Sequence, residues 1–292
     1  MTLPELRPEI LALYDAMSGS RADAYLSEIL VPSLARAGHC NSDAASVREH
    51  FLAPYGCLEF VFGHYAFARR GKDRFDLSEI ALESLRRTSS ADQFGQFLAL
   101  EHAESLWDMF VEVCREKNRK PMEQLNSGVV AGMAELAQEI YQIDGTGSIA
   151  QWVVKGVQQT GRIEPQFLRM VDVRGIGPKI SSLFLRDIVV FFGLEELIDP
   201  VDRLYVQPID KWMRAIAPYV IDEPNADDLA DWILAGKLSK YARRAGVSGT
   251  LFNMGVTWFG MREVRAPEFF DSAVRSLVQS ELNPMKPNAE LR

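Results

Sequence analysis

The chain contains little cysteine and no long apolar run, and both absences narrow the classes of protein to which it can belong. Its 292 residues include three cysteines, Cys40, Cys57 and Cys114, which are odd in number and far apart. That spacing argues against a disulfide framework and favours a reducing compartment. No apolar run approaches the length of a membrane span, and the N-terminus lacks a basic region followed by an apolar one. We therefore expect a soluble, cytoplasmic protein with no membrane partner.

Runs of alternating β-branched residues, the usual sign of half-buried strands, are also absent. Apolar residues recur instead at the three- and four-residue spacing of amphipathic helices. With 47% hydrophobic residues, the chain can build one large domain or two modest ones, each with its own core. The sequence therefore predicts an all-α fold.

The chain also lacks an excess of positive charge. Its formal net charge is −8, and this opposes non-specific attraction to nucleic acid, which depends on Lys and Arg neutralising phosphates. The bases are unevenly distributed, however, because six of them face a single Glu between Lys237 and Arg265. We expect Lys240 and Arg243 in this segment to contact DNA; the alternative is a solvated helix end.

The stretch around Val173–Lys179 carries the clearest local signal. Gly175 and Gly177 stand at alternate positions between two apolar-periodic segments, which indicates a tight turn between helices. Glycine amides that precede a helix N-terminus form a small anion site suited to a phosphate. The alternative is an ordinary corner between helices, in which Gly175 ends one helix and Pro178 opens the next.

Lys179 follows this turn, and Pro200-Val201-Asp202 follows the second helix. Together with the Gly-Ile-Gly sequence, these residues resemble the helix-hairpin-helix DNA glycosylases with a Gly-Pro-Asp loop, the group that includes endonuclease III and the 8-oxoguanine glycosylases. The resemblance covers residues 147–260 and implies two helical lobes that flank a cleft. It further implies that the chain excises a damaged or modified base from duplex DNA and has an associated lyase activity. The DNA contacts implied at the turn are Arg174, Gly175, Ile176 and Gly177.

Two residues match the catalytic positions of that family. Lys179 is the candidate nucleophile, since an amine that attacks the sugar C1′ displaces the base and leaves a Schiff base. Asp202 is the candidate carboxylate, which would stabilise positive charge on the sugar as the base departs. Its separation from Lys179 exceeds the family's usual spacing, so Asp199 is the fallback. Pro208 would interrupt the helix that Asp202 is expected to start. A helix cap by Asp202 and a surface role for Lys179 are the alternatives.

We expect no metal or cofactor. His39, Cys40, His50, Cys57 and His64 are irregularly spaced for a zinc site. Some members of the resembled family carry a four-cysteine iron–sulfur cluster near the C-terminus, and this chain has no cysteine beyond Cys114.

Three regions are expected along the chain. Residues 1–146 form an N-terminal helical region that packs with the C-terminal helices, residues 147–282 form the glycosylase-like domain, and residues 283–292 form a flexible tail. Phe252-Asn253 resembles a late helix that packs under the active site in that family. We expect a monomer whose partner is DNA. The competing hypothesis is a non-catalytic helix-hairpin-helix protein that binds DNA or another protein.

Overall fold

The computed structural model describes residues 5–67, 74–100 and 103–283. These residues form helices, turns and loops and contain no strand, so the predicted all-α class is confirmed over the described part of the chain. None of the described helices has the length and apolar character needed to cross a bilayer. The expected tail lies outside the described residues except for Asn283.

The chain divides into two compact units, the first formed by Met1–Ile29 with Val206–Arg292 and the second by Leu30–Tyr205. The boundary expected at residues 146 and 147 falls inside the second unit, in the turn between α9 (Glu123–Asp144) and α10 (Ile149–Thr160). Of the expected N-terminal region, only the opening segment groups with the C-terminal helices.

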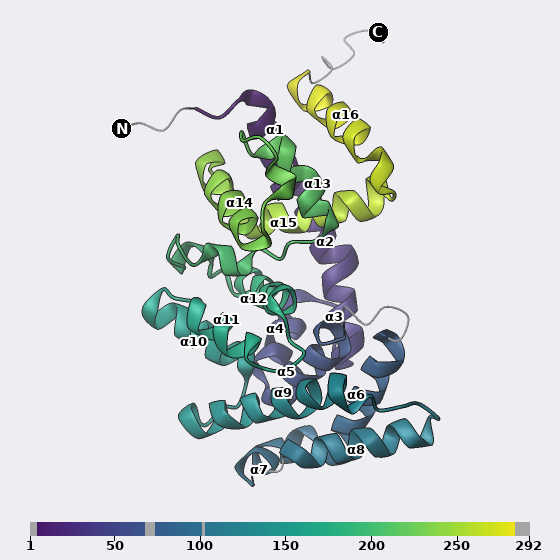
Figure 1. Ribbon diagram of the computed structural model, residues 1–292. Coiled ribbons are helices and arrows are strands. Elements are labelled where there is room, and N and C mark those ends of the chain that lie inside the picture. The colour runs from purple at the N-terminus through teal and green to yellow at the C-terminus, as the bar shows by residue number, and fades with distance from the viewer. Residues whose placement is uncertain (1–4, 68–73, 101–102, 284–292) are drawn as a thin grey trace, which may run out of the picture. The chain divides into compact units, whose positions relative to one another are not determined.

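The first unit brings together the two ends of the described chain (Figure 1). Its helical segments are α1 (Pro8–Ala16), η1 (Met17–Arg21), α2 (Ala22–Tyr25), η2 (Leu26–Leu30), α13 (Lys211–Val220), η8 (Ala226–Asp228), α14 (Asp231–Ala245), α15 (Gly249–Trp258), η9 (Phe259–Val264), η10 (Pro267–Phe269) and α16 (Phe270–Leu282), with the last residue of η2 at the boundary of the second unit. In Figure 1 the purple α1 and α2 lie beside the green and yellow helices of the C-terminal segment.

Helix α15 packs closely against the N-terminal segment of the first unit. Gly255 approaches the backbone so closely that an added Cβ would lie 1.8 Å from the carbonyl oxygen of Met17. The rings of Tyr14 and Phe252 lie 4.3 Å apart between centroids, and the Tyr14 hydroxyl donates to the carbonyl of Leu238 over 3.5 Å. Segments distant in sequence therefore share one core, and the absence of a side chain at Gly255 permits their close approach.

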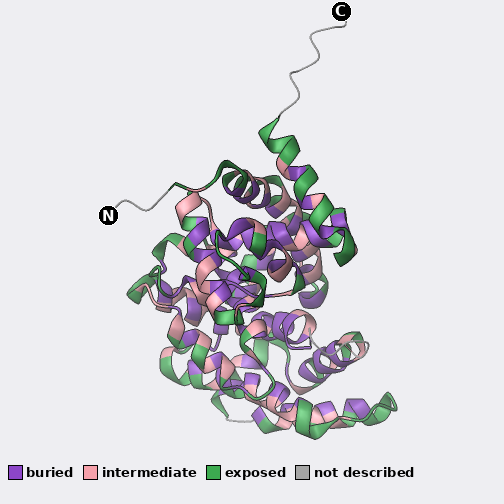
Figure 2. Ribbon diagram, turned by 45° about the horizontal axis from the view of Figure 1, so that its top comes forward, coloured by how far each residue is buried: buried purple, intermediate pink, exposed green. Residues whose placement is uncertain are grey.

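The second unit contains the remaining helices. They are α3 (Val31–Gly38), α4 (Ala44–Leu52), α5 (Pro54–Phe60), η3 (Val61–Tyr65), α6 (Arg74–Thr88), η5 (Ala91–Gln93), α7 (Phe94–Ala99), α8 (Ala103–Glu116), α9, α10, α11 (Glu164–Val171), α12 (Pro178–Phe192), η6 (Glu195–Leu197) and η7 (Arg203–Val206). Figure 2 shows buried residues along the inward sides of these helices. The core includes the aromatic side chains of Phe60, Phe62, Tyr65 and Phe67, which pack inside the unit rather than form an exposed surface.

Helix α12 is buried on nearly every side, as expected for a helix inside a larger helical unit. Its Phe184 ring contacts the rings of Phe51 and Tyr65, at centroid distances of 6.1 and 5.2 Å. Arg186 and Asp187 are 1% and 0% exposed and form an ion pair of 2.7 Å, and the Tyr65 hydroxyl donates to the second carboxylate oxygen over 2.9 Å. Because each buried charge has a partner, α12 can pass through the core without an unpaired ion.

Candidate functional site

Residues Asp172–Gly177 join α11 to α12 in a tight turn. Gly175 adopts φ of 92°, a left-handed conformation that side chains disfavour. The amide of Ile176 donates to the carbonyl of Val173 over 2.9 Å and closes the turn. Gly177 has φ of −90° and ψ of 171° and is the N-cap of α12, which begins with Pro178. The sequence therefore predicted the position of the turn and the start of the second helix correctly.

Helix α9 packs against this turn. Ile176 and Val173 are buried, and an added Cβ on Gly128 of α9 would lie 2.5 Å from the Cβ of Arg174. The base of the Arg174 side chain therefore rests on α9, although the residue as a whole is exposed. Beside the turn lies a hollow of about 480 Å³ lined by Arg174, Gly175, Ile176, Gly177, Ile180, Ala66, Gln124 and Leu125. The four consecutive residues predicted to contact DNA all line this hollow, and the contact itself remains a prediction.

Lys179 lies in the first turn of α12 and is half-buried. Among the described residues, no ion pair or side-chain hydrogen bond holds its amine. It is not one of the residues that line the hollow beside the turn. Within the described part of the chain the amine is therefore free of a structural partner, which suits either a chemical or a phosphate-binding role.

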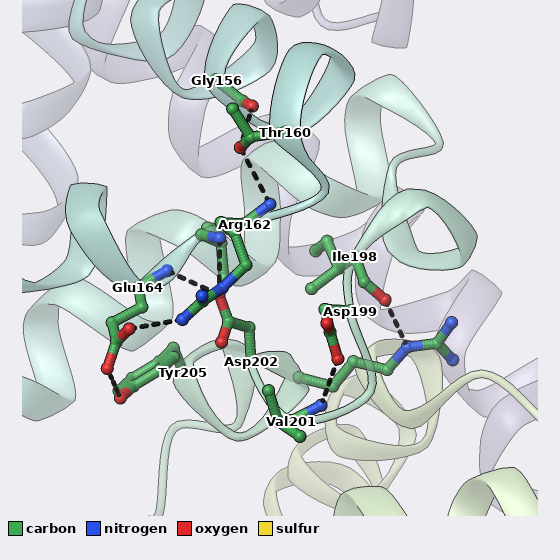
Figure 3. Close-up of polar contacts among 11 residues, drawn as sticks. Gly156, Thr160, Arg162, Glu164, Ile198, Asp199, Val201, Asp202 and Tyr205 are labelled. Atoms are coloured by element: carbon green, nitrogen blue, oxygen red, sulfur yellow. Dashed lines mark hydrogen bonds and ion pairs between the residues drawn. The ribbon is translucent and has the colours of Figure 1, made fainter.

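Asp202 is buried in the second unit, where it is 1% exposed, and Figure 3 shows its polar contacts. Its Oδ2 atom accepts three hydrogen bonds, from Arg162 Nε at 2.7 Å and from the amides of Ile163 and Glu164 at 3.0 and 3.1 Å. Burial acts to raise the pKa of this carboxyl, but the hydrogen bonds from Arg162 and the amides, with the Arg162 charge, outweigh burial and lower it. Asp202 therefore stabilises the start of α11 as an anion, rather than capping the helical turn η7 that follows it.

Further contacts close this network around Asp202. Arg162 also pairs with the carboxylate of Glu164, and the Tyr205 hydroxyl donates to the other oxygen of Glu164 over 2.8 Å. Burial, followed by the contact with Glu164, raises the pKa of Tyr205 to about 12. The Phe167 ring lies 4.6 Å from that of Tyr205 between centroids. Within the described residues, Lys179 is not among the hydrogen-bond partners of Asp202, and the catalytic roles of the two residues remain a prediction.

Asp199, the fallback carboxylate, lies at the surface. Its Oδ1 atom accepts a hydrogen bond from the Val201 amide over 3.1 Å (Figure 3), and its own amide donates to the carbonyl of Gly161 over 2.8 Å. One carboxylate oxygen is therefore engaged by the local turn. The side chain is accessible to solvent, in contrast to that of Asp202.

Asp210 is a carboxylate that the sequence analysis did not select. It is the N-cap of α13, where its Oδ1 atom accepts from the amides of Trp212 and Met213 at 2.9 and 2.8 Å. The helix expected to start at Asp202 is only the short turn η7, and Pro208 lies in the segment before α13 rather than within a helix. The missed signal was Pro208-Ile209-Asp210 ahead of an apolar-periodic segment, which is the pattern of a helix start.

Asn253 holds the segment that leads into Asp210. This fully buried side chain donates from Nδ2 to the carbonyl of Pro208 over 3.1 Å and to Oε1 of Gln207 over 3.4 Å. The Phe252-Asn253 pair noted in the sequence thus lies in the core of the first unit and anchors the approach to α13. Its effect on the position of Asp210 is indirect and passes through the backbone.

Lys240 and Arg243 are exposed and lie one turn apart on α14. They belong to the first unit, and the Gly-Ile-Gly turn belongs to the second. That they share a DNA-binding face with the turn therefore remains a prediction.

Among the described residues, no cluster of three or more His, Cys, Asp or Glu side chains is arranged to hold a metal ion. Comparisons with protein-family models, curated proteins and solved structures gave no match to this chain.

Proposed function

We propose that this protein is a DNA glycosylase that excises a damaged or modified base and cleaves the strand through a lysine Schiff base. One observation carries the proposal. A tight Gly-Ile-Gly turn leads directly into the N-terminus of α12, and Lys179 lies in the first turn of that helix with no ion-pair partner among the described residues. Backbone amides beside a helix N-terminus suit a DNA phosphate, and an unpaired amine nearby suits attack on the adjoining sugar.

The proposed reaction begins with attack of the Lys179 amine on C1′ of the target nucleotide. The C1′–N bond breaks, the base leaves with the bonding electron pair, and a proton is transferred to the base. Loss of a proton from the Lys nitrogen and opening of the sugar ring give the imine, from which β-elimination breaks the strand on the 3′ side. A carboxylate near C1′ stabilises the positive charge that develops on the sugar.

Three aspartates are candidates for the carboxylate that stabilises positive charge on the sugar. Asp202, the first choice from sequence, is 1% exposed and already accepts three hydrogen bonds on one oxygen. Asp199 and Asp210 each use one oxygen in a local turn or helix cap, and neither is fully buried. Because charge stabilisation requires approach to the substrate, burial disfavours Asp202, whereas Asp199 and Asp210 are at least partly accessible.

Borohydride trapping tests the nucleophile. With borohydride present, the wild-type protein should become covalently attached to a DNA strand that carries its substrate base or a preformed abasic site. Lys179→Gln should abolish trapping and strand cleavage together. Lys120→Gln is the matched control, since Lys120 is an exposed lysine of the same unit with no ion pair among the described residues. If the wild-type protein fails to trap on an abasic site, the lyase assignment is wrong.

The substrate panel contains 8-oxoguanine, oxidised pyrimidines, uracil, alkylated purines and modified cytosines. On whichever base is removed, single Asn variants of Asp199, Asp202 and Asp210 identify the carboxylate. Loss of the catalytic one should slow excision severely and leave DNA binding nearly unchanged, because its charge acts mainly in the transition state. Full excision by all three variants would exclude this chemistry.

The second candidate function is a non-catalytic protein that binds DNA or another protein through the same turn. The net charge of −8 favours it, because an acidic chain gains little from general attraction to a polyanion. Duplex binding without trapping or excision on any substrate would support a DNA-binding protein. Absence of binding to any duplex would support a protein partner.

A further inference from the structure

A second concave site lies in the second unit, away from the residues considered so far. It is a pocket of about 410 Å³ between α3, η3, α6 and the residue that follows α8. Ala37, Gly63 and Leu82 contribute apolar surface to its wall. Its shape and size suit a small molecule rather than a flat protein surface.

Four cationic side chains from three parts of the unit line this pocket, Arg36, Arg74, Arg86 and Lys117. Arg36 comes from the last turn of α3, Arg74 opens α6, Arg86 lies near the end of α6, and Lys117 follows α8. The acids of the lining are Glu79 and Glu83, and Glu83 is already engaged by Arg87, which donates to it over 2.8 Å. The lining is therefore positive in a chain whose net charge is −8.

Among the described residues, only one of these four cations takes part in an ion pair. Among the described residues, Arg36, Arg74 and Lys117 take part in no ion pair, and Arg86 reaches only Glu59, at 4.0 Å. Glu59 is buried and pairs more closely with His50, at 2.8 Å. Like charges gathered around one hollow repel each other unless an anion occupies it. The arrangement therefore points to an anionic ligand.

His64 also lines the pocket. Burial, and then the charges of Arg74 and Arg186, lower its pKa to about 3. The imidazole is therefore neutral near pH 7, and it can offer one N–H donor and one acceptor without adding charge.

The rim of the pocket carries an exposed aromatic ring. Phe75 is 68% exposed, and the guanidinium of Arg74 lies 5.5 Å from its ring centroid. This exposed ring offers a surface for stacking a flat ligand. The pocket thus combines a cationic centre with an aromatic edge.

We propose that this pocket binds a phosphate monoester that carries a flat aromatic ring, the chemical class of the nucleoside monophosphates. The phosphate would lie among Arg36, Arg86 and Lys117, and the ring would stack on Phe75. Arginine suits the phosphate because its planar guanidinium donates two parallel hydrogen bonds to phosphate oxygens. This site does not depend on the proposed glycosylase activity, since none of its residues belongs to the Gly-Ile-Gly turn or to the candidate carboxylates.

Titration calorimetry on the full chain tests the proposal with adenosine 5′-monophosphate, adenosine and inorganic phosphate as separate probes. We expect the monophosphate to bind tightest, phosphate to bind more weakly and adenosine to bind weakest. Arg36→Ala and Arg86→Ala should each weaken monophosphate binding about tenfold, as expected for the loss of charge-assisted hydrogen bonds. Phe75→Ala should weaken monophosphate binding and leave phosphate binding unchanged.

Arg48→Ala is the control, because Arg48 is an exposed arginine of the same unit outside the pocket, and it should bind like the wild type. Thermal unfolding of each variant checks that the fold is retained. Equal binding of phosphate and monophosphate would overturn the assignment of the ring, and wild-type affinity in both arginine variants would overturn the site. Binding of a single-stranded oligonucleotide but not of the monophosphate, lost in the same variants, would replace the proposal with a nucleic-acid surface.

Discussion

The carboxylate of Asp202 closes the polar network at the start of α11. Three donors meet on its Oδ2 atom, and two of them are backbone amides that the first turn of a helix leaves without partners. Its negative charge also lies close to the positive end of the α11 dipole. These contacts give Asp202 a structural role. Asp202 should therefore contribute to stability whether or not it takes part in catalysis.

The pH dependence of stability tests this role. Replacing Asp202 with Asn removes the charge, and we expect a loss of roughly 1–3 kcal/mol in the free energy of unfolding at pH 7. The folded state lowers the pKa of this carboxyl below the ordinary 3.8, so its contribution is fully present above 3.8 and is lost as pH falls through the folded value. Denaturant titrations of both proteins should therefore differ by a constant amount above about pH 5 and converge in acid.

Asp199→Asn is the matched control for that experiment, since Asp199 is exposed and makes one local contact through its side chain. We expect it to change stability by less than about 0.5 kcal/mol. An equal loss in the two variants would contradict the structural role assigned to Asp202.

The sequence predicted the conformation of a residue where neighbouring residues in the chain determine that conformation. Gly175 could be placed in a turn because two helical patterns flank it and because glycine tolerates the left-handed backbone that it adopts. The surroundings of Asp202 could not be predicted, because its partners Arg162, Ile163 and Glu164 lie in a different segment of the chain. Asp210 could have been found from its position at a helix start, had Pro208 been assigned to the preceding loop.

At the scale of elements, the contact between α15 and the N-terminal segment depends on a missing side chain. Gly255→Ala would place a Cβ 1.8 Å from the Met17 carbonyl oxygen, and backbone cannot yield as a flexible side chain can. We expect a loss on the order of 3 kcal/mol from this overpacking, measured by chemical denaturation. Gly236→Ala on α14 is the control, because an added Cβ there meets nothing within 4 Å. It should stabilise the protein by about 0.5–1 kcal/mol through helix propensity.

The two glycines of the Gly-Ile-Gly turn should respond differently to an added side chain. Gly177 has φ of −90°, which any residue adopts, so Gly177→Val should preserve the fold. If the amides of this turn contact a DNA phosphate, the added side chain should block the approach and weaken duplex binding, which fluorescence anisotropy would measure. Gly175→Val should destabilise the turn itself, because Gly175 has φ of 92°. Unchanged duplex affinity in the Gly177→Val variant would remove the turn from the binding surface.

The elements of the chain were more predictable than their arrangement. Ser148 is of a residue type that favours helix N-caps, and its hydroxyl oxygen accepts from the Gln151 amide over 3.1 Å at the start of α10. A cap depends on residues within one turn, and sequence contains that information directly. The contact between Gly255 and Met17 depends on two segments far apart in the chain, and no local pattern specifies it.

At the scale of the whole molecule, the acidic net charge should govern binding to DNA. We expect affinity for a duplex to fall as salt rises, with a shallow slope because few bases are available to neutralise phosphates. Replacing both Lys240 and Arg243 with Glu should impair binding and reduce the salt slope by about 2. Thermal stability should remain unchanged because both side chains are exposed.

Salt titrations of the wild type and of this double variant provide the measurement. Arg275→Glu, on α16 of the same unit, carries the same charge change as Lys240→Glu or Arg243→Glu alone, and it serves as the control for altered net charge when compared with these single variants. If the double variant binds as the wild type does, Lys240 and Arg243 are a solvated helix end and lie outside the DNA surface.

The division into units was the least predictable property. The helical periodicity predicted the all-α class, yet the sequence contains no Pro- or Gly-rich linker at the boundary near residues 29 and 30. Unit boundaries follow from which apolar faces meet, and many pairings of amphipathic helices satisfy the same pattern.

The discontinuous first unit sets an order of events during synthesis on the ribosome. Helix α1 and its neighbours leave the exit tunnel first, but the α13–α16 segment that covers their apolar side chains is translated only after the whole second unit. At usual elongation rates this delay lasts roughly 10 to 35 s, long enough for the second unit to fold alone. Throughout that interval Ile10, Leu13 and Tyr14, which are buried in the finished protein, lack their final partners. The nascent N-terminal segment is therefore the part of this chain best suited to capture by a cotranslational chaperone.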